Sequence, residues 1–449
     1  MTSKVELVQE SDKEAHDQTV IPVEPSSAED IFDGGRAAWC TAIGGSLAVA
    51  TTFGYANSFG VYQDLYTRSH TASASAISWI GSTQLFFLLV GALPGGKLLD
   101  MGYFRHTTLV GSVTYVFCLF MVSLCDPQKY YQLYLAQGLG MGIGSGLLYV
   151  PALAVQSHHW RARRAFAMGI VASGSSIGGL MFPIILNQLF KSSLGFEWGV
   201  RVSAFVVLAM LIGANLLMTP KKRFKNTSAS DRPDIKGIMT DGPYLVTIVG
   251  MFFGNWGVFI PYFYLQLFAI VHGVNPTTAF YLVREHSCRV SEFKSSSTSK
   301  IAILNGAAIP GRILPNMLAD YLGPFNTITP VLLACGVLIY GLIGINTVAG
   351  IVVFAILYGF MSGAALSLVA PGVAVLARHP SEIGIRFGLA FSLSGFGALV
   401  GSPVTGALLG SRFAWTNAIA FNGASMTVSF IFLIIVRQIL VKRRGSQII

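Results

Sequence analysis

The chain has 449 residues, of which 53% are hydrophobic and 11% are charged. This balance argues against a soluble protein and indicates an all-α membrane protein. The net charge of +10 does not indicate nucleic-acid binding, because the basic residues lie in short clusters between apolar runs, where they orient a membrane chain. Five scattered cysteines, without CxxC or Cys/His spacing, predict neither disulfides nor a metal site.

The N-terminal segment, residues 1–35, is rich in acids and has no hydrophobic periodicity. Such a composition predicts a disordered tail. It has neither the basic start nor the apolar core of a secretory signal. Membrane insertion is therefore expected to begin with the first spanning helix.

Apolar runs long enough to cross about 30 Å of hydrocarbon recur along the rest of the chain. We predict twelve transmembrane helices, at 37–63, 76–99, 106–125, 130–155, 165–190, 199–219, 243–270, 301–319, 327–346, 348–377, 384–410 and 414–436. With both termini inside, most of the 30 Lys and Arg residues lie on the inner side. The positive-inside bias therefore predicts cytoplasmic termini, most simply in the plasma membrane.

The charges also divide the chain. A cytoplasmic linker at 220–242, which contains KKRFK, separates an N-terminal half at 36–219 from a C-terminal half at 243–440, and a basic cytoplasmic tail follows at 441–449. Asp100 and Asp320 each close a segment after the second helix of a half, and Arg164 and Arg386 each open the fifth helix. These spacings indicate two six-helix, pseudo-symmetric halves.

A lone arginine, Arg312, interrupts the apolar run IAILNGAAIPGRILPNMLAD. Because a charge inside a bilayer costs a few kcal/mol, such residues usually face a protein interior or a watery path. The guanidinium is permanently charged and matches a carboxylate with two hydrogen bonds. We predict that Arg312 binds an anion; the alternative is that it snorkels to the interface or braces Asp320.

Two motifs carry a family resemblance. GGKLLDMGYFR, from Gly95 to Arg105, resembles the short-loop motif of the major facilitator superfamily. HWRARRAFAMGIVASGSSIGGLMFP, from His159 to Pro183, is similar, together with Asp33-Gly34-Gly35 and Trp39, to the signatures of the monocarboxylate porter family, particularly its fungal branch. The resemblance covers residues 33–440, apart from the polar segment at 284–300. It implies the major facilitator fold, alternating access around a site between the halves, and an Asp100 carboxylate bound to a helix end and a nearby arginine.

The chain also departs from the proton-coupled lactate carriers of that family. Ala308 lies four residues before Arg312 where the resemblance implies an acid, and Asn57, Ser58 and Phe59 replace an expected lysine. No Asp or Glu lies deep in a predicted span. These departures weaken both the lactate assignment and proton symport, although protons remain an open coupling partner.

We therefore expect a secondary transporter of a small organic anion, a monocarboxylate or a related metabolite. The alternative is an exporter of a secondary metabolite; riboflavin-like vitamin uptake and a non-transporting nutrient receptor are minor alternatives. We expect no enzyme activity, cofactor or metal, and the partners are a small-molecule substrate and the lipid bilayer, with a monomer as the functional unit. The predicted substrate-binding residues are Arg312, Asn57, Asn255, Asn305, Tyr149 and Trp256, and the predicted gating residues are Asp100, Arg105, Arg164 and Asp320. For the amides and aromatic residues, helix packing is an open alternative.

One polar segment, REHSCRVSEFKSSSTSK at 284–300, interrupts an apolar run. Its retention leaves 301–318 as a span of about 27 Å, which is marginal for a bilayer. We hypothesise that it is an unspliced intron or a mis-set exon border. Sequencing the transcript tests this, because a dominant message containing these codons contradicts the hypothesis.

Overall fold

The computed structural model describes residues 33–221, 235–271, 299–345, 347–378, 382–409 and 415–448, and every element within them is helical. Nearly all of the predicted disordered tail and of the polar segment 284–300 lies outside the described residues. The described residues from Gly34 onward belong to one structural unit.

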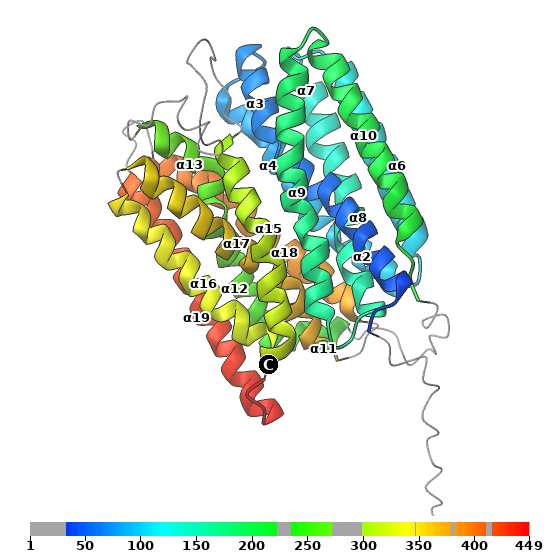
Figure 1. Cartoon of the computed structure of the whole chain (residues 1–449), viewed down its shortest axis with the longest axis vertical. Helices are drawn as coiled ribbons and strands as arrows, with labels where there is room; N and C mark the ends of the chain where they lie inside the picture. The colour runs from blue at the N-terminus through cyan, green and yellow to red at the C-terminus, as the bar shows by residue number, and fades with distance from the viewer. Residues whose placement is uncertain are drawn as a thin grey trace, which may run out of the picture. The chain divides into compact units, whose positions relative to one another are not determined.

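The helices follow the predicted order (Figure 1). The N-terminal set contains α2 (Arg36–Val49), η2 (Ala50–Gly54), α3 (Phe59–Arg68), α4 (Ala74–Val90), α5 (Ala92–Asp100), α6 (Phe104–Leu124), α7 (Tyr130–Leu133), η3 (Tyr134–Gly140), α8 (Met141–Ala154), η4 (Val155–His158), α9 (Arg164–Lys191) and α10 (Gly195–Leu217). A short helix, α11 (Ile235–Met239), precedes the C-terminal set, which contains α12 (Gly242–Val258), α13 (Ile260–Val271), α15 (Ser299–Leu322), α16 (Pro324–Gly341), η7 (Leu342–Gly344), α17 (Val348–Leu376), α18 (Ile383–Leu409) and α19 (Trp415–Arg444).

The predicted all-helical membrane fold is confirmed. Eleven helical stretches in the described part of the chain are long and apolar enough to cross a membrane. The remaining predicted span, the eighth at 301–319, corresponds to α15, which is not among these eleven stretches. At 24 residues, α15 is about 36 Å long, because the helix continues to Leu322. It is therefore longer than the predicted span and less apolar than the other eleven.

Several predicted spans are discontinuous. The first contains a π-helical turn, η2, and then breaks at Asn57 and Ser58 before α3. The seventh breaks at Phe259, between α12 and α13. Pro261 explains the second break, because its nitrogen has no hydrogen to donate to the carbonyl of Gly257. Next to the break, the Tyr358 hydroxyl donates a hydrogen bond to the Val258 carbonyl at 2.8 Å. The predicted linker at 220–242 contains the short helix α11.

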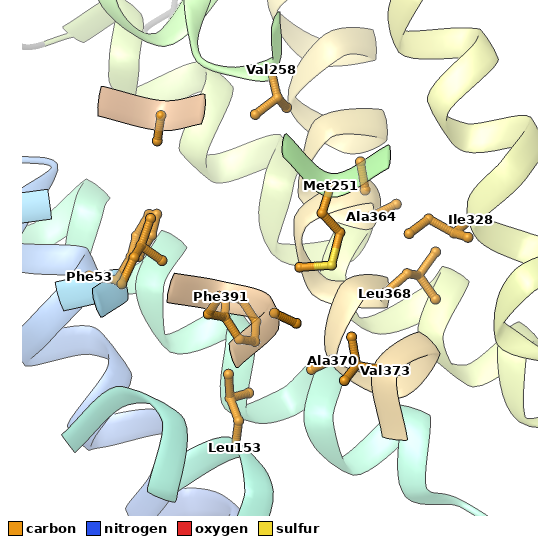
Figure 2. Packing of buried hydrophobic residues seen from close by; sticks show 14 of the residues in the cluster. Phe53, Leu153, Met251, Val258, Ile328, Ala364, Leu368, Ala370, Val373 and Phe391 are labelled. Atoms are coloured by element: carbon orange, nitrogen blue, oxygen red, sulfur yellow. The ribbon is translucent and has the colours of Figure 1, made fainter. Parts of the chain in front are cut away.

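Apolar side chains cover the outer surface as well as the interior. Leu109, Val113 and Phe117 lie one turn apart on α6 and are each more than half exposed. An apolar stripe of this kind suits contact with lipid. Inside, one buried cluster runs from Ala48 to Leu440 and draws on both helix sets. Figure 2 shows part of it, with Phe53 on the N-terminal side and Phe391 on the C-terminal side.

Candidate functional site: a buried arginine between the two helix sets

The last residue of α5, Asp100, binds the start of α18. Its carboxylate accepts hydrogen bonds from the backbone N–H of Gly384 at 3.0 Å and of Ile385 at 2.6 Å. The first amides of a helix have no partner within the helix and carry partial positive charge. A carboxylate from the N-terminal set thus caps a helix of the C-terminal set.

Asp320 makes the reciprocal contact. Its two carboxylate oxygens accept hydrogen bonds from the amides of Ala165 and Phe166, at 2.8 and 2.9 Å, at the start of α9. The C-terminal set therefore caps a helix of the N-terminal set in the same way. We call the end of the bundle that carries Asp100 and Asp320 the aspartate end; the two contacts hold the helix sets together there.

Of the two arginines predicted to act with these acids in gating, Arg164 lies beside its acid and Arg105 does not pair with Asp100. Arg164 is the first residue of α9, and its charge interacts with Asp320. Arg105 is exposed, and no ion pair between it and Asp100 is found among the described residues. The expected arginine partner of Asp100 is therefore not seen among the described residues, and its carboxylate is held by helix amides alone.

A buried ion network close to Asp100 was missed by the sequence reasoning. Arg386 of α18 is fully buried; its Nε donates to Glu382 and one terminal nitrogen donates to Asp241, both at 3.1 Å. The guanidinium also lies 5.0 Å from the centre of the Tyr244 ring. The sequence did mark Arg386, because it opens the fifth helix of its half as Arg164 does in the other half. It did not show which acidic residues would pair with Arg386.

Arg312 lies where α15 packs against α9. Its side chain is buried, at 4% exposure, and a terminal nitrogen donates a hydrogen bond to the Ala172 carbonyl at 3.1 Å. The low exposure contradicts the snorkelling alternative. Its Nε is buried without a hydrogen-bond partner, which is costly for a charged group. One donor of the guanidinium therefore has no acceptor in the contact between the two sets.

Two tyrosines, one from each helix set, interact with Arg312. The arginine interacts electrostatically with Tyr149 of α8 and with the hydroxyl of Tyr262 of α13. Tyr149 packs against Phe53 of η2 at 5.8 Å and against Phe391 of α18 at 5.7 Å, measured between ring centroids. Tyr149 was a predicted site residue, and the structure places it beside Arg312.

The ring contacts continue into the seventh predicted span. Phe259, at its break, lies 6.2 Å from Tyr262 and 6.5 Å from Phe53 between ring centroids. We call Phe53, Tyr149, Phe259, Tyr262 and Phe391 the ring group. Discontinuous helices often line the substrate sites of transporters, and the ring group adjoins the breaks in the first and seventh spans.

The predicted amides divide into two groups. Asn57 and Asn305 both approach Gly179 of α9; a Cβ atom built there would lie 3.0 Å from Asn57 Nδ2 and 3.1 Å from Asn305 Oδ1. By contrast, Asn255 donates to the Ser394 carbonyl of α18 at 3.4 Å. Asn57 and Asn305 therefore meet where α9 adjoins α15, whereas Asn255 is used in helix packing.

Trp256 is also placed away from Arg312 by its contacts. Its ring packs against Phe252 and Phe253 of its own helix and against Phe421 of α19. It therefore belongs to an aromatic cluster inside the C-terminal set. In the part of the chain that the structure describes, no group of three or more His, Cys, Asp or Glu residues could hold a metal ion.

Comparisons with known proteins agree with this architecture. A model of the Major Facilitator Superfamily matches residues 41–377. The chain is 37% identical to the aspyridones efflux protein apdF of Emericella nidulans over 93% of this chain and 81% of that protein. It is 31% identical to the agnestins efflux protein AgnL12 of Paecilomyces divaricatus, over 88% and 86% respectively.

Solved structures show the same fold at low sequence identity. The transporter FucP in its outward conformation matches with a TM-score of 0.66 and 14% identity, over 89% of this chain and 99% of that chain. The human organic anion transporter MFSD10 matches with a TM-score of 0.66 and 13% identity, over 89% and 99%. At these identities the likeness concerns the fold alone.

Proposed function

Since the chain belongs to the Major Facilitator Superfamily and is a membrane transporter, we propose that it exports an acidic, ring-bearing secondary metabolite by alternating access between its two helix sets. The observation that carries this proposal is the buried Arg312, whose Nε has no partner. A substrate carboxylate or enolate can accept from that nitrogen, and charge-assisted hydrogen bonds of this kind are among the stronger ones in proteins.

The relatives support the proposed direction of transport. The aspyridones and agnestins proteins are both named as efflux proteins. They favour the exporter alternative over the main expectation of a carrier of a small organic anion or monocarboxylate. Carboxylate uptake of the monocarboxylate porter type becomes the second candidate, because Arg312 suits a simple carboxylate equally well. The rings beside Arg312 favour a larger, ring-bearing acid.

The sidedness completes the proposal. The positive-inside bias places the aspartate end and both termini in the cytoplasm, and we propose the plasma membrane as the location. In the present structure the cytoplasmic end is then held closed by the contacts of Asp100 and Asp320. A cytoplasmic substrate can reach Arg312 only after both contacts separate, so these two acids are proposed as the inner gate.

The proposal is tested by comparing acidic metabolites inside and outside fungal cells that express the chain or Arg312→Gln. We expect the wild type to raise the ratio of external to internal concentration for a small number of ring-bearing acids, and Arg312→Gln to abolish that rise while still reaching the membrane. Arg201→Gln is the matched control, because Arg201 pairs with Glu197 on α10, away from α15. An unchanged ratio for wild type and variant alike contradicts the proposal.

A further inference from the structure

The ring group presents two aromatic faces from opposite helix sets. Phe53 and Phe259 have an interplanar angle of 28° and a centroid separation of 6.5 Å. A planar ring held face to face between two others needs about twice the optimal carbon–carbon contact of 3.5–4.0 Å, or about 7–8 Å. The existing separation is therefore about an ångström short of admitting a conjugated ring.

Both phenylalanines lie at discontinuities of the helical backbone, where the distance between their rings can change without breaking a continuous run of helical hydrogen bonds. Phe53 belongs to the π-helical turn η2, and Phe259 lies between α12 and α13. Moving a residue at a helix discontinuity does not require a continuous ladder of helical hydrogen bonds to break. A small separation of the two rings is therefore compatible with the rest of both helices staying in place.

The ring group is enclosed less completely than another aromatic cluster of the protein. Phe53, Phe259 and Phe391 are 7, 8 and 6% exposed, whereas Tyr62 and Phe182, in the aromatic cluster of the N-terminal set, are not exposed at all. The ring group is therefore the looser of the two, and it is the one connected through Tyr149 and Tyr262 to Arg312.

We propose that Phe53 and Phe259 determine specificity by holding a planar conjugated ring of the substrate between them while Arg312 binds its ionised oxygen. This inference rests on the proposed function and adds the substrate class: a flat, conjugated acid whose acidic group adjoins the ring. Tyr149 and Tyr262 link each phenylalanine to Arg312, so the ring and the acidic group are recognised as one rigid unit. A saturated, puckered acid of equal charge cannot fill the same space.

The test uses a matched pair of probes, 2-naphthoate and decahydro-2-naphthoate, which carry the same charge on a flat and on a puckered frame. Binding to the purified full chain is measured by calorimetry. Because stacking on two aromatic faces adds to simple burial, the wild type should prefer naphthoate by about tenfold. Phe53→Leu and Phe259→Leu keep an apolar side chain but remove the ring, and each should reduce the preference to less than about threefold.

The control variant is Phe117→Leu, on the exposed face of α6, which should keep the full preference. An equal affinity of the wild type for both probes overturns the inference, as does a preference that survives in both leucine variants. Lack of binding by either probe also overturns it. Arg312→Gln separates the two claims, because loss of both probes in that variant upholds the anion site even where the leucine variants contradict the ring site.

Discussion

A terminal nitrogen of Arg312, on α15, donates a hydrogen bond to the carbonyl of Ala172, on α9, at 3.1 Å. The bond joins the C-terminal helix set to the N-terminal set through the same side chain that we propose to hold the substrate. An anion that draws the guanidinium away from Ala172 removes one contact between the sets. Substrate binding and the separation of α9 from α15 are therefore expected to be coupled.

The first prediction concerns the capping aspartates. Replacing Asp100 or Asp320 with alanine removes a helix cap worth about 0.5–2 kcal/mol, so the aspartate end should open about 2- to 30-fold more often. The distance distribution between spin labels at the exposed Tyr103 and Tyr321, in a cysteine-replaced background, should gain a longer component. Asp126→Ala, in a loop acid paired with Lys129, should leave the distribution unchanged, and an unchanged distribution in both aspartate variants contradicts the capping role.

A second prediction concerns the close approach of α5 to α18. A Cβ atom added at Gly96 would fall on the carbonyl of Gly384, so the two helices cannot keep their spacing around a larger side chain. Gly96→Val should prevent closure of the aspartate end and reduce transport at least tenfold, with normal amounts in the membrane. Gly341→Val has no atom near the added group and serves as the control; full transport by Gly96→Val refutes the tight contact.

The buried Arg386 network gives a third prediction, about stability. Arg386→Met leaves the buried Glu382 carboxylate without its guanidinium partner and leaves Asp241 with only its longer contact to the exposed Arg443, at 3.5 Å. Breaking a buried ion pair in this way typically costs about 3–5 kcal/mol. The triple variant Arg386→Met, Asp241→Asn, Glu382→Gln should recover much of that loss because no buried charge remains. Thermal unfolding of the purified protein measures both, and Glu197→Gln, in the largely exposed pair with Arg201, should change stability by less than about 1 kcal/mol. Equal stability of the single variant and the wild type contradicts an ion network at this site.

Sequence reasoning located the helices because a span of some twenty apolar residues is a local signal, read without knowledge of neighbours. It also paired Asp100 with Asp320 as repeats, since each closes the segment at the end of the second predicted helix of its half. The breaks at Asn57 and Phe259 were missed, because a short interruption within an apolar run leaves the hydrophobic pattern intact. Only Pro261 indicated the second break.

Of the residues at the candidate site, only the charged one, Arg312, could be singled out from the sequence with a physical reason. Arg312 is conspicuous in an apolar run, and its burial could be argued from the cost of exposing it to lipid. Phe53 and Phe259 resembled the many other phenylalanines of the spans, and their pairing depends on how the two sets pack. Asn255 and Trp256 were chosen by residue type, but the direction in which each faces on α12 is set by contacts with α18 and α19.

The most direct measurement is outward flux of labelled 2-naphthoate in proteoliposomes containing the full chain, with Arg312→Gln and Arg201→Gln run in parallel. The account predicts saturable flux by the wild type and by Arg201→Gln, and at least a hundredfold lower flux by Arg312→Gln at equal protein density. Equal flux by Arg312→Gln and the wild type would contradict the assignment of Arg312 as the residue that binds the transported anion.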